Sequence, residues 1–364
     1  MQNFVVSARK YRPLRFDDVV GQSAITETLE QAIKNHQLAQ ALLFCGPRGV
    51  GKTTCARILA RRINEEAGGI TDGEEDFTFN IFELDAASNN SVDDIRSLTE
   101  QVRFAPQVGK FKVYIIDEVH MLSTAAFNAF LKTLEEPPAH AIFILATTEK
   151  HKIIPTILSR CQIYDFKRIS IKDIQNHLIK IANEENVSFE DDALHLIAQK
   201  ADGALRDALS TFDRMVTFTS GDLTLEKVAE NLNVLDYEYY FKITDAALKN
   251  DIQDLLLQFN EILNKGFDGH VFVSGLGSHF RDLLVAKSAK TAELLEVGEK
   301  TKAKYLEQAN HCDLAFLTNA IEICNMTDLN YKTSRNARLT VEIGLMQIGS
   351  LTAEDNQIKK KSSE

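Results

Sequence analysis

One glycine-rich loop holds the residues best suited to chemistry. It joins an apolar run at 41–45 to a helical pattern at 52–63, and its residues are Gly46, Pro47, Arg48, Gly49, Val50, Gly51, Lys52 and Thr53. Glycines let backbone N–H groups curl toward phosphate oxygens, and the helix N-terminus adds positive charge. This spacing predicts a loop in which Lys52 reaches the β- and γ-phosphates of a nucleotide while Thr53 holds magnesium. The alternative is a tight turn that binds nothing.

Two further polar pairs follow apolar runs. Asp117 and Glu118 end the run at 111–116, and Thr147 and Thr148 end the run at 141–146. If both runs are strands, Asp117 completes a magnesium shell, partly through water, and Glu118 activates or orients the attacking water. The threonines would lie outside the carboxyl end of a strand, where open α/β sheets bind ligands. Each pair also has an ordinary alternative, a helix start for the acids and a strand-ending hydrogen bond for the hydroxyls.

Two basic segments are open to more than one interpretation. Tyr11 and Pro13, with Arg12 between them, could pack on a purine, or the segment could be a solvated N-terminal arm. Arg96 and Arg103 are seven residues apart in a helical pattern, which places them on nearly the same face. Such a pair could follow a nucleic-acid backbone or be two solvated surface arginines.

The elements that must position these residues change character along the chain. Strand-like runs alternate with helical patterns to about residue 165, which predicts a parallel α/β sheet covered by helices. From residue 170 onward the patterns are helical, with no convincing strand. At about 150 residues per domain, 364 residues predict two or three domains. We expect domains at 1–166, 167–234 and 235–354, followed by a disordered tail at 355–364.

Composition narrows the protein class. A hydrophobic content of 44% with 26% charged residues is typical of globular proteins, and the net charge of −11 argues against a generally basic, nucleic-acid-coating surface. The sequence lacks a signal-peptide pattern and an apolar run long enough to cross a bilayer, which predicts a cytoplasmic protein without membrane contact. Five widely spaced cysteines favour buried, reduced thiols over disulfides.

Several segments together resemble a known family. They are ARKYRP, VVGQ, LDAASNNSVDDIR, IIDEVHML, LKTLEEPP, ATTEKHKI, LSRC and ALRDAL, spread over residues 8–209. In these the chain resembles the gamma/tau ATPase subunits of bacterial DNA polymerase III clamp loaders, which are AAA+ proteins. The resemblance implies an α/β AAA+ nucleotide-binding domain, a small helical lid domain and an all-α collar domain for oligomerisation.

The resemblance also implies roles for individual residues. Arg160 matches an arginine finger that reaches the γ-phosphate in a neighbouring subunit, Thr148 a sensor, and Arg206 a second sensor facing the subunit's own ATP. Arg96 matches a DNA-facing position, to which the helix face adds Arg103. The implied ATP-binding set comprises Arg206, the loop from Gly46 to Thr53, and Tyr11, Arg12, Pro13, Val19, Val20 and Thr54.

The implied activity is ATP hydrolysis that loads a sliding clamp onto primer-template DNA, with ATP and Mg²⁺ as cofactors. The implied partners are further copies of the chain, delta and delta-prime subunits, the clamp and DNA, at replication forks. Family members commonly carry a four-cysteine zinc module where residues 64–76 lie, but this stretch has no cysteine. We therefore expect an acidic surface loop and no zinc, which metal analysis of purified protein would check. Alternatives are a non-hydrolysing stator of the same complex, and another AAA+ DNA motor such as a branch-migration translocase.

Overall fold

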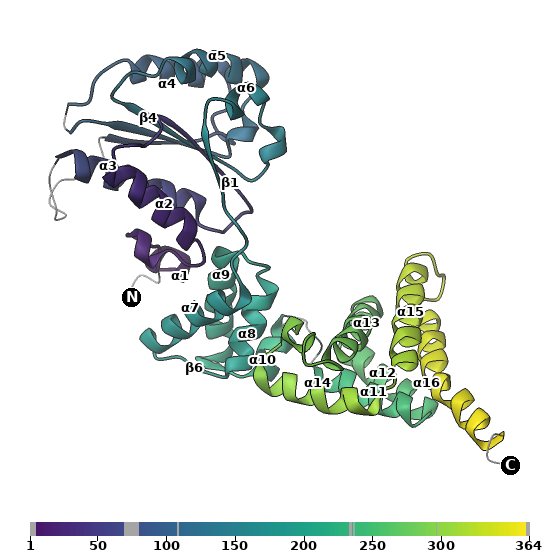
Figure 1. The fold of residues 1–364 in the computed structure, drawn as a ribbon. Coiled ribbons are helices and arrows are strands. Elements are labelled where there is room, and N and C mark those ends of the chain that lie inside the picture. The colour runs from purple at the N-terminus through teal and green to yellow at the C-terminus, as the bar shows by residue number, and fades with distance from the viewer. Residues whose placement is uncertain are drawn as a thin grey trace. The chain divides into compact units, whose positions relative to one another are not determined.

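A computed structural model describes residues 5–68, 80–107, 109–232, 235, 237–295 and 297–361. Most of the acidic loop expected at 64–76 therefore lies outside the described residues. The N-terminal half forms an α/β domain and the C-terminal half is helical (Figure 1), which confirms the predicted fold class.

Five parallel strands form the central sheet in the order β2-β3-β4-β1-β5. The strands are β1 (Ala41–Cys45), β2 (Ile81–Asp85), β3 (Lys112–Asp117), β4 (Ala141–Thr147) and β5 (Gln162–Asp165). Strands β1 and β4 are buried along their whole length, as expected for apolar runs in a sheet covered on both faces. The apolar runs at 41–45, 111–116 and 141–146 anticipated β1, β3 and β4, whereas no run was identified for β5.

Helices cover both faces of this sheet (Figure 1). On one face α4 (Val92–Val102) and α5 (Thr124–Glu135) share a core with Tyr114 and Phe143 of the sheet. On the other, α2 (Ser23–Lys34) and α3 (Lys52–Gly68) share a core with Phe44 and Ile144. Alternate residues of one strand therefore serve opposite cores.

Strand order brings three polar chain segments to one edge. Because β4 lies between β1 and β3, the loops that follow all three strands leave the sheet side by side. The glycine-rich loop follows β1, Glu118 follows Asp117 at the end of β3, and Thr148 follows β4. Short elements continue from the same edge: η3 (Val119–Met121), η4 (Lys150–Lys152) and α6 (Pro155–Leu158).

The next segment consists of α7 (Ile171–Glu184), α8 (Asp191–Lys200), α9 (Leu205–Thr219) and α10 (Leu225–Asn231). The expectation of no strand here is wrong in one detail, because β6 (Ser188–Phe189) pairs in parallel with β7 (Asp222–Leu223). Two-residue strands are too short to produce a readable alternation of polar and apolar residues.

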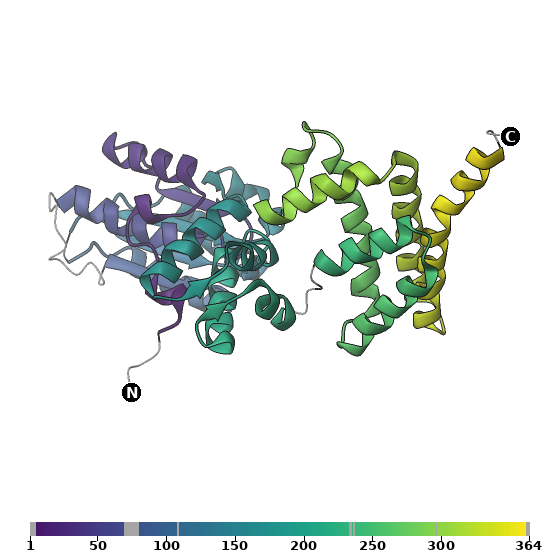
Figure 2. The ribbon, with the colours of Figure 1, turned by 90° about the horizontal axis from the view of Figure 1, so that it is seen from below.

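The C-terminal segment is a group of helices (Figure 1 and Figure 2), and side chains from these helices form one large apolar core. They are α11 (Tyr237–Leu248), α12 (Ile252–Asn264), α13 (Gly269–Ala286), η5 (Ala292–Leu294), α14 (Glu299–His311), α15 (Leu314–Tyr331) and α16 (Ala337–Lys361). Helix α16 continues to Lys361, seven residues into the segment for which the sequence predicts a disordered tail. The added stretch contains Glu, Gln and Lys without Gly or Pro, so nothing in it stops a helix.

By its contacts the chain divides into two compact units, Met1–Asn186 with Ile197–Thr217, and Val187–Leu196 with Phe218–Glu364. The first unit contains the sheet and every residue of the site described below. Among the described residues, no helix has the length and apolar character to cross a membrane.

Candidate active site

The glycine-rich loop wraps around the ammonium group of Lys52. Lys52 begins α3, is 5% exposed, and donates hydrogen bonds of 2.7 Å from Nζ to the carbonyl oxygens of Gly46 and Pro47. Gly46, Gly49 and Gly51 all have positive φ, which permits this tight path. Burial lowers the pKa of Lys52, and the nearby carboxylates of Glu118 and Asp117 partly oppose that shift.

Thr53 and Asp117 meet although 64 positions separate them. The Thr53 hydroxyl donates to Asp117 Oδ2 at 2.7 Å, and the other carboxylate oxygen accepts from the backbone N–H of Glu118 at 2.9 Å. A hydroxyl beside a carboxylate is an all-oxygen donor set, and Mg²⁺ in nucleotide sites commonly takes one or two protein oxygens with phosphates and water. The pair therefore fits magnesium.

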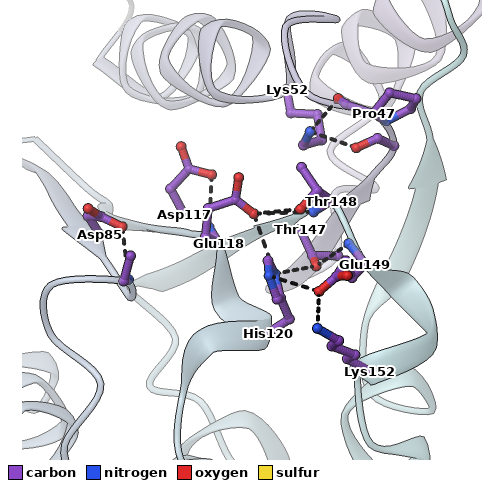
Figure 3. Close-up of polar contacts among 12 residues, drawn as sticks. Pro47, Lys52, Asp85, Asp117, Glu118, His120, Thr147, Thr148, Glu149 and Lys152 are labelled. Carbon is purple, nitrogen blue, oxygen red and sulfur yellow. Dashed lines mark hydrogen bonds and ion pairs between the residues drawn. The ribbon is translucent and has the colours of Figure 1, made fainter. Parts of the chain in front are cut away.

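Glu118 is held in an uncommon backbone conformation. Its φ of 47° and ψ of 43° are left-handed, so the chain turns sharply after β3. Its Oε2 accepts hydrogen bonds from Thr148 Oγ1 at 3.0 Å and from Thr148 N at 3.3 Å (Figure 3). The two residues that the sequence placed at the ends of separate strands thus contact each other directly.

A pocket of about 180 Å³ opens beside these groups. Its described lining includes most of the expected ATP-binding residues, namely Arg12, Pro13, Val19, Val20, Arg48, Gly49, Val50, Gly51, Lys52, Thr53, Thr54 and Arg206, together with Asp117 and Glu118. It also includes four residues that the sequence did not single out: Ala8, Ile169, Leu205 and Leu209. Ala8, Leu205 and Leu209 belong to the segments ARKYRP and ALRDAL, which gave these apolar residues no role of their own, whereas Ile169 follows β5 outside any of the segments.

Positive charge gathers around this pocket. Burial lowers the pKa of Arg12, and the cationic Arg57 and Arg206 lower it further. Arg12 and Arg206 line the pocket with Arg48 and Lys52. A cluster of cations that raise one another's electrostatic energy suits a polyanionic ligand.

Tyr11, Gly46 and Pro47 do not belong to the described pocket lining. The Tyr11 hydroxyl donates instead to Glu185 at 2.5 Å, just beyond α7, and Ser7 of the short helix α1 (Ser7–Lys10) donates to Asp213 of α9. Gly46 and Pro47 contribute the carbonyls that hold Lys52. The N-terminal segment is thus tied to α7 and α9, contacts that no sequence pattern signalled.

The remaining expected site residues lie away from the pocket lining. Arg160 follows α6 and donates to Glu135 Oε1 at 2.5 Å and to the Thr156 carbonyl at 2.7 Å. Arg96 on α4 is exposed and pairs loosely with Asp93 at 3.4 Å, whereas Arg103 is the residue that caps the end of that helix. These three arginines therefore lie outside the pocket that the other expected residues line.

Three family models match successive parts of the chain. They are described as DNA polymerase III delta subunit (residues 21–170), DNA polymerase III clamp loader subunit ATPase lid domain (173–221), and DNA polymerase III subunits gamma and tau domain III (223–360).

Full-length relatives agree with these matches. DNA polymerase III subunit gamma of Buchnera aphidicola subsp. Baizongia pistaciae is 32% identical, over 98% of this chain and 100% of its own length. Subunit tau of Bacillus subtilis is 40% identical over 93% of this chain, and subunit tau of Escherichia coli 41% over 73%. The chain spans 62% and 43% of the lengths of these two tau subunits.

Among solved structures, the Thermotoga maritima RuvB Holliday junction branch migration motor superposes with a TM-score of 0.50 at 21% identity, over 71% of this chain and 86% of RuvB. At this identity the likeness concerns the fold alone.

Proposed function

Because the chain belongs to the gamma/tau family of DNA polymerase III subunits, we propose that it is an ATP-hydrolysing motor of a clamp loader. The observation that carries the proposal is the convergence of Lys52, Thr53, Asp117, Glu118 and Thr148 at one edge of the sheet. A non-hydrolysing stator has no need for a complete set of phosphate, metal and water ligands. The likeness to RuvB extends only to the fold and gives no independent support to a translocase.

The proposed chemistry assigns each residue a role. Lys52 exchanges its bonds to the Gly46 and Pro47 carbonyls for phosphate oxygens, to which its charge is better matched. Thr53 and Asp117 would hold magnesium, which when bound neutralises charge on the phosphates. Glu118 orients the attacking water and accepts its proton, and Thr148 fixes the direction of that carboxylate.

The wider assignments are also proposals. Val19, Val20 and Pro13 flank the base, and Arg206 contacts the phosphates from α9. Arg160 acts in the site of a neighbouring subunit, and Arg96 with Arg103 contacts DNA phosphates. The partners are further copies of this chain, delta and delta-prime subunits, a sliding clamp and primer-template DNA, in the cytoplasm at replication forks. The proposed domains are 1–166, 167–234 and 235–354; the family models meet at 170–173 and at 221–223.

The test compares ATP turnover of the chain assembled with its partner subunits, clamp and primed DNA. We expect turnover that Lys52→Ala abolishes together with ATP binding. Arg160→Ala should spare ATP binding in its own subunit yet suppress hydrolysis, since its guanidinium lies outside its own pocket. Turnover that is absent from the full assembly, or indifferent to Lys52→Ala, would refute the motor function. Loss of ATP binding in Arg160→Ala would show that its role is misplaced.

A further inference from the structure

His120 lies between the carboxylates of Glu118 and Glu149 (Figure 3). It belongs to η3, and its side chain is 9% exposed. Nδ1 is 3.1 Å from Thr147 Oγ1 and 3.4 Å from Glu118 Oε2, whereas Nε2 is 3.3 Å from Glu149 Oε2. Nε2 thus faces one carboxylate oxygen, and Nδ1 faces both a hydroxyl oxygen and a second carboxylate oxygen. Both ring nitrogens have partners, and the orientation of the imidazole is fixed.

One side of His120 contacts the group proposed to activate water. The same oxygen of Glu118 receives both hydrogen bonds from Thr148 and faces His120 Nδ1. If Glu118 turns to orient a water molecule at the γ-phosphate, the contacts of this oxygen change. His120 is therefore placed to respond to the direction of the Glu118 side chain.

The other side of His120 contacts the start of the segment that leads to Arg160. Glu149 accepts from Lys152 of η4 at 2.5 Å, and its backbone N–H donates to Thr147 Oγ1 at 3.0 Å. Arg160 lies eight positions after Lys152, beyond η4 and α6. Ile153 and Ile157 anchor this segment in the core at 3% and 0% exposure. Close packing lets so short and well anchored a segment move as one body.

We propose that His120 is a positioning residue that couples the orientation of Glu118 to the segment bearing Arg160. Through it, the state of a subunit's own site alters the arginine offered to the next subunit. The inference rests on the proposed function, because Glu118 and Arg160 have those roles only in an assembled ATPase. A histidine that merely filled the core would affect stability without separating nucleotide binding from turnover.

The first experiment measures nucleotide affinity and turnover of His120→Ala, His120→Asn and His120→Gln in the full assembly. His151→Ala is the matched control, since His151 is an exposed histidine on η4, the element that follows Glu149. We expect His120→Ala to keep its Kd for ATP within about twofold and to lose ~10- to 100-fold in kcat, the usual cost of misplaced groups. Asn and Gln, which can replace one ring nitrogen each, should recover part of the loss. A kcat equal to that of the control, or a parallel loss of affinity and kcat in all three variants, would overturn the proposal.

The second experiment tests the effect on the neighbour. Wild-type chain is mixed in increasing ratio with Lys52→Ala chain, or with chain carrying both Lys52→Ala and His120→Ala, before assembly. Neither variant turns over its own ATP, so any additional loss in the double variant arises in the adjacent wild-type site. We expect that additional loss, approaching that of chain with Lys52→Ala and Arg160→Ala. Identical titration curves would refute the coupling alone, whereas wild-type turnover that does not depend on Lys52 would refute the proposed function itself.

Discussion

Two glycines of the glycine-rich loop provide a matched pair of substitutions. Gly46 and Gly51 both have positive φ, 148° and 103°, beyond the left-handed helical region, so alanine at either position costs about 1–3 kcal/mol of backbone strain. Their surroundings differ. A Cβ on Gly46 would lie 2.9 Å from Phe166 Cβ and closer still to the Phe166 carbonyl oxygen, whereas a Cβ on Gly51 would meet nothing within 4 Å.

Relieving the clash at Gly46 would require a movement of the backbone that costs free energy. Phe166 is fixed by its N–H bond to the Cys45 carbonyl at 2.7 Å, and Gly46 by its N–H bond to the Thr147 carbonyl at 3.2 Å. Overpacking of this kind costs about 1–3 kcal/mol. Gly46→Ala should therefore lower the free energy of unfolding by about 2–6 kcal/mol, and Gly51→Ala by only about 1–3 kcal/mol.

The assay is hydrogen exchange of the β1 and β4 amides as a function of urea, which reports the unfolding free energy of the unit that holds the loop. The difference between the two variants isolates the close approach of the loop to Phe166. If both variants lose the same stability, or Gly51→Ala loses more, the reasoning about this approach is wrong.

Three further outcomes follow from the geometry and charges. Glu118→Gln should keep ATP affinity within about twofold and lower single-turnover hydrolysis by about 10²- to 10⁴-fold; hydrolysis within tenfold of wild type would exclude Glu118 as the base. Native protein at pH 8 should react with a thiol reagent at least about 100-fold more slowly than urea-unfolded protein. The reason is that burial raises the pKa values of the cysteines and so lowers the fraction of reactive thiolate. These pKa values are about 11 for Cys45, Cys161 and Cys312, and about 12 for Cys55 and Cys324. Fast labelling of Cys55 would contradict its burial. Burial lowers the pKa of His279 to about 3, against an ordinary 6.5, despite its hydrogen bond to Gln308. Below pH 6.5 the unfolded state therefore binds a proton that the folded state does not. The free energy of unfolding of the C-terminal unit should fall by about 2 kcal/mol between pH 7 and pH 5. Urea unfolding at both pH values checks this, with His279→Gln as the variant that should show a smaller pH dependence.

Local patterns predicted most of the secondary structure because they depend on neighbours in the chain. The apolar run before Gly46 and the apolar stripe after Ser123 specify a strand and a helix without knowledge of the rest of the fold. The same reasoning did not identify β5, α11 or the pairing of β6 with β7, whose signals are short or are decided by distant partners.

The sequence by itself determined the chemistry available to this protein. Lys52 and Thr53 are neighbours in the chain at the end of the glycine-rich loop, so the sequence alone places them together at the start of a helix. The sequence also places an acidic pair after one apolar run and a threonine hydroxyl after another. Its segments resemble those of a known family.

Only the tertiary structure decided which of these groups meet. The position of β4 between β1 and β3 brings Thr53 to Asp117 and Thr148 to Glu118 across intervals of 64 and 30 residues. The same strand order places His120 between Glu118 and Glu149. Contacts of this kind arise from strand order and register, which are set by burial of the whole sheet and which no short stretch of sequence encodes.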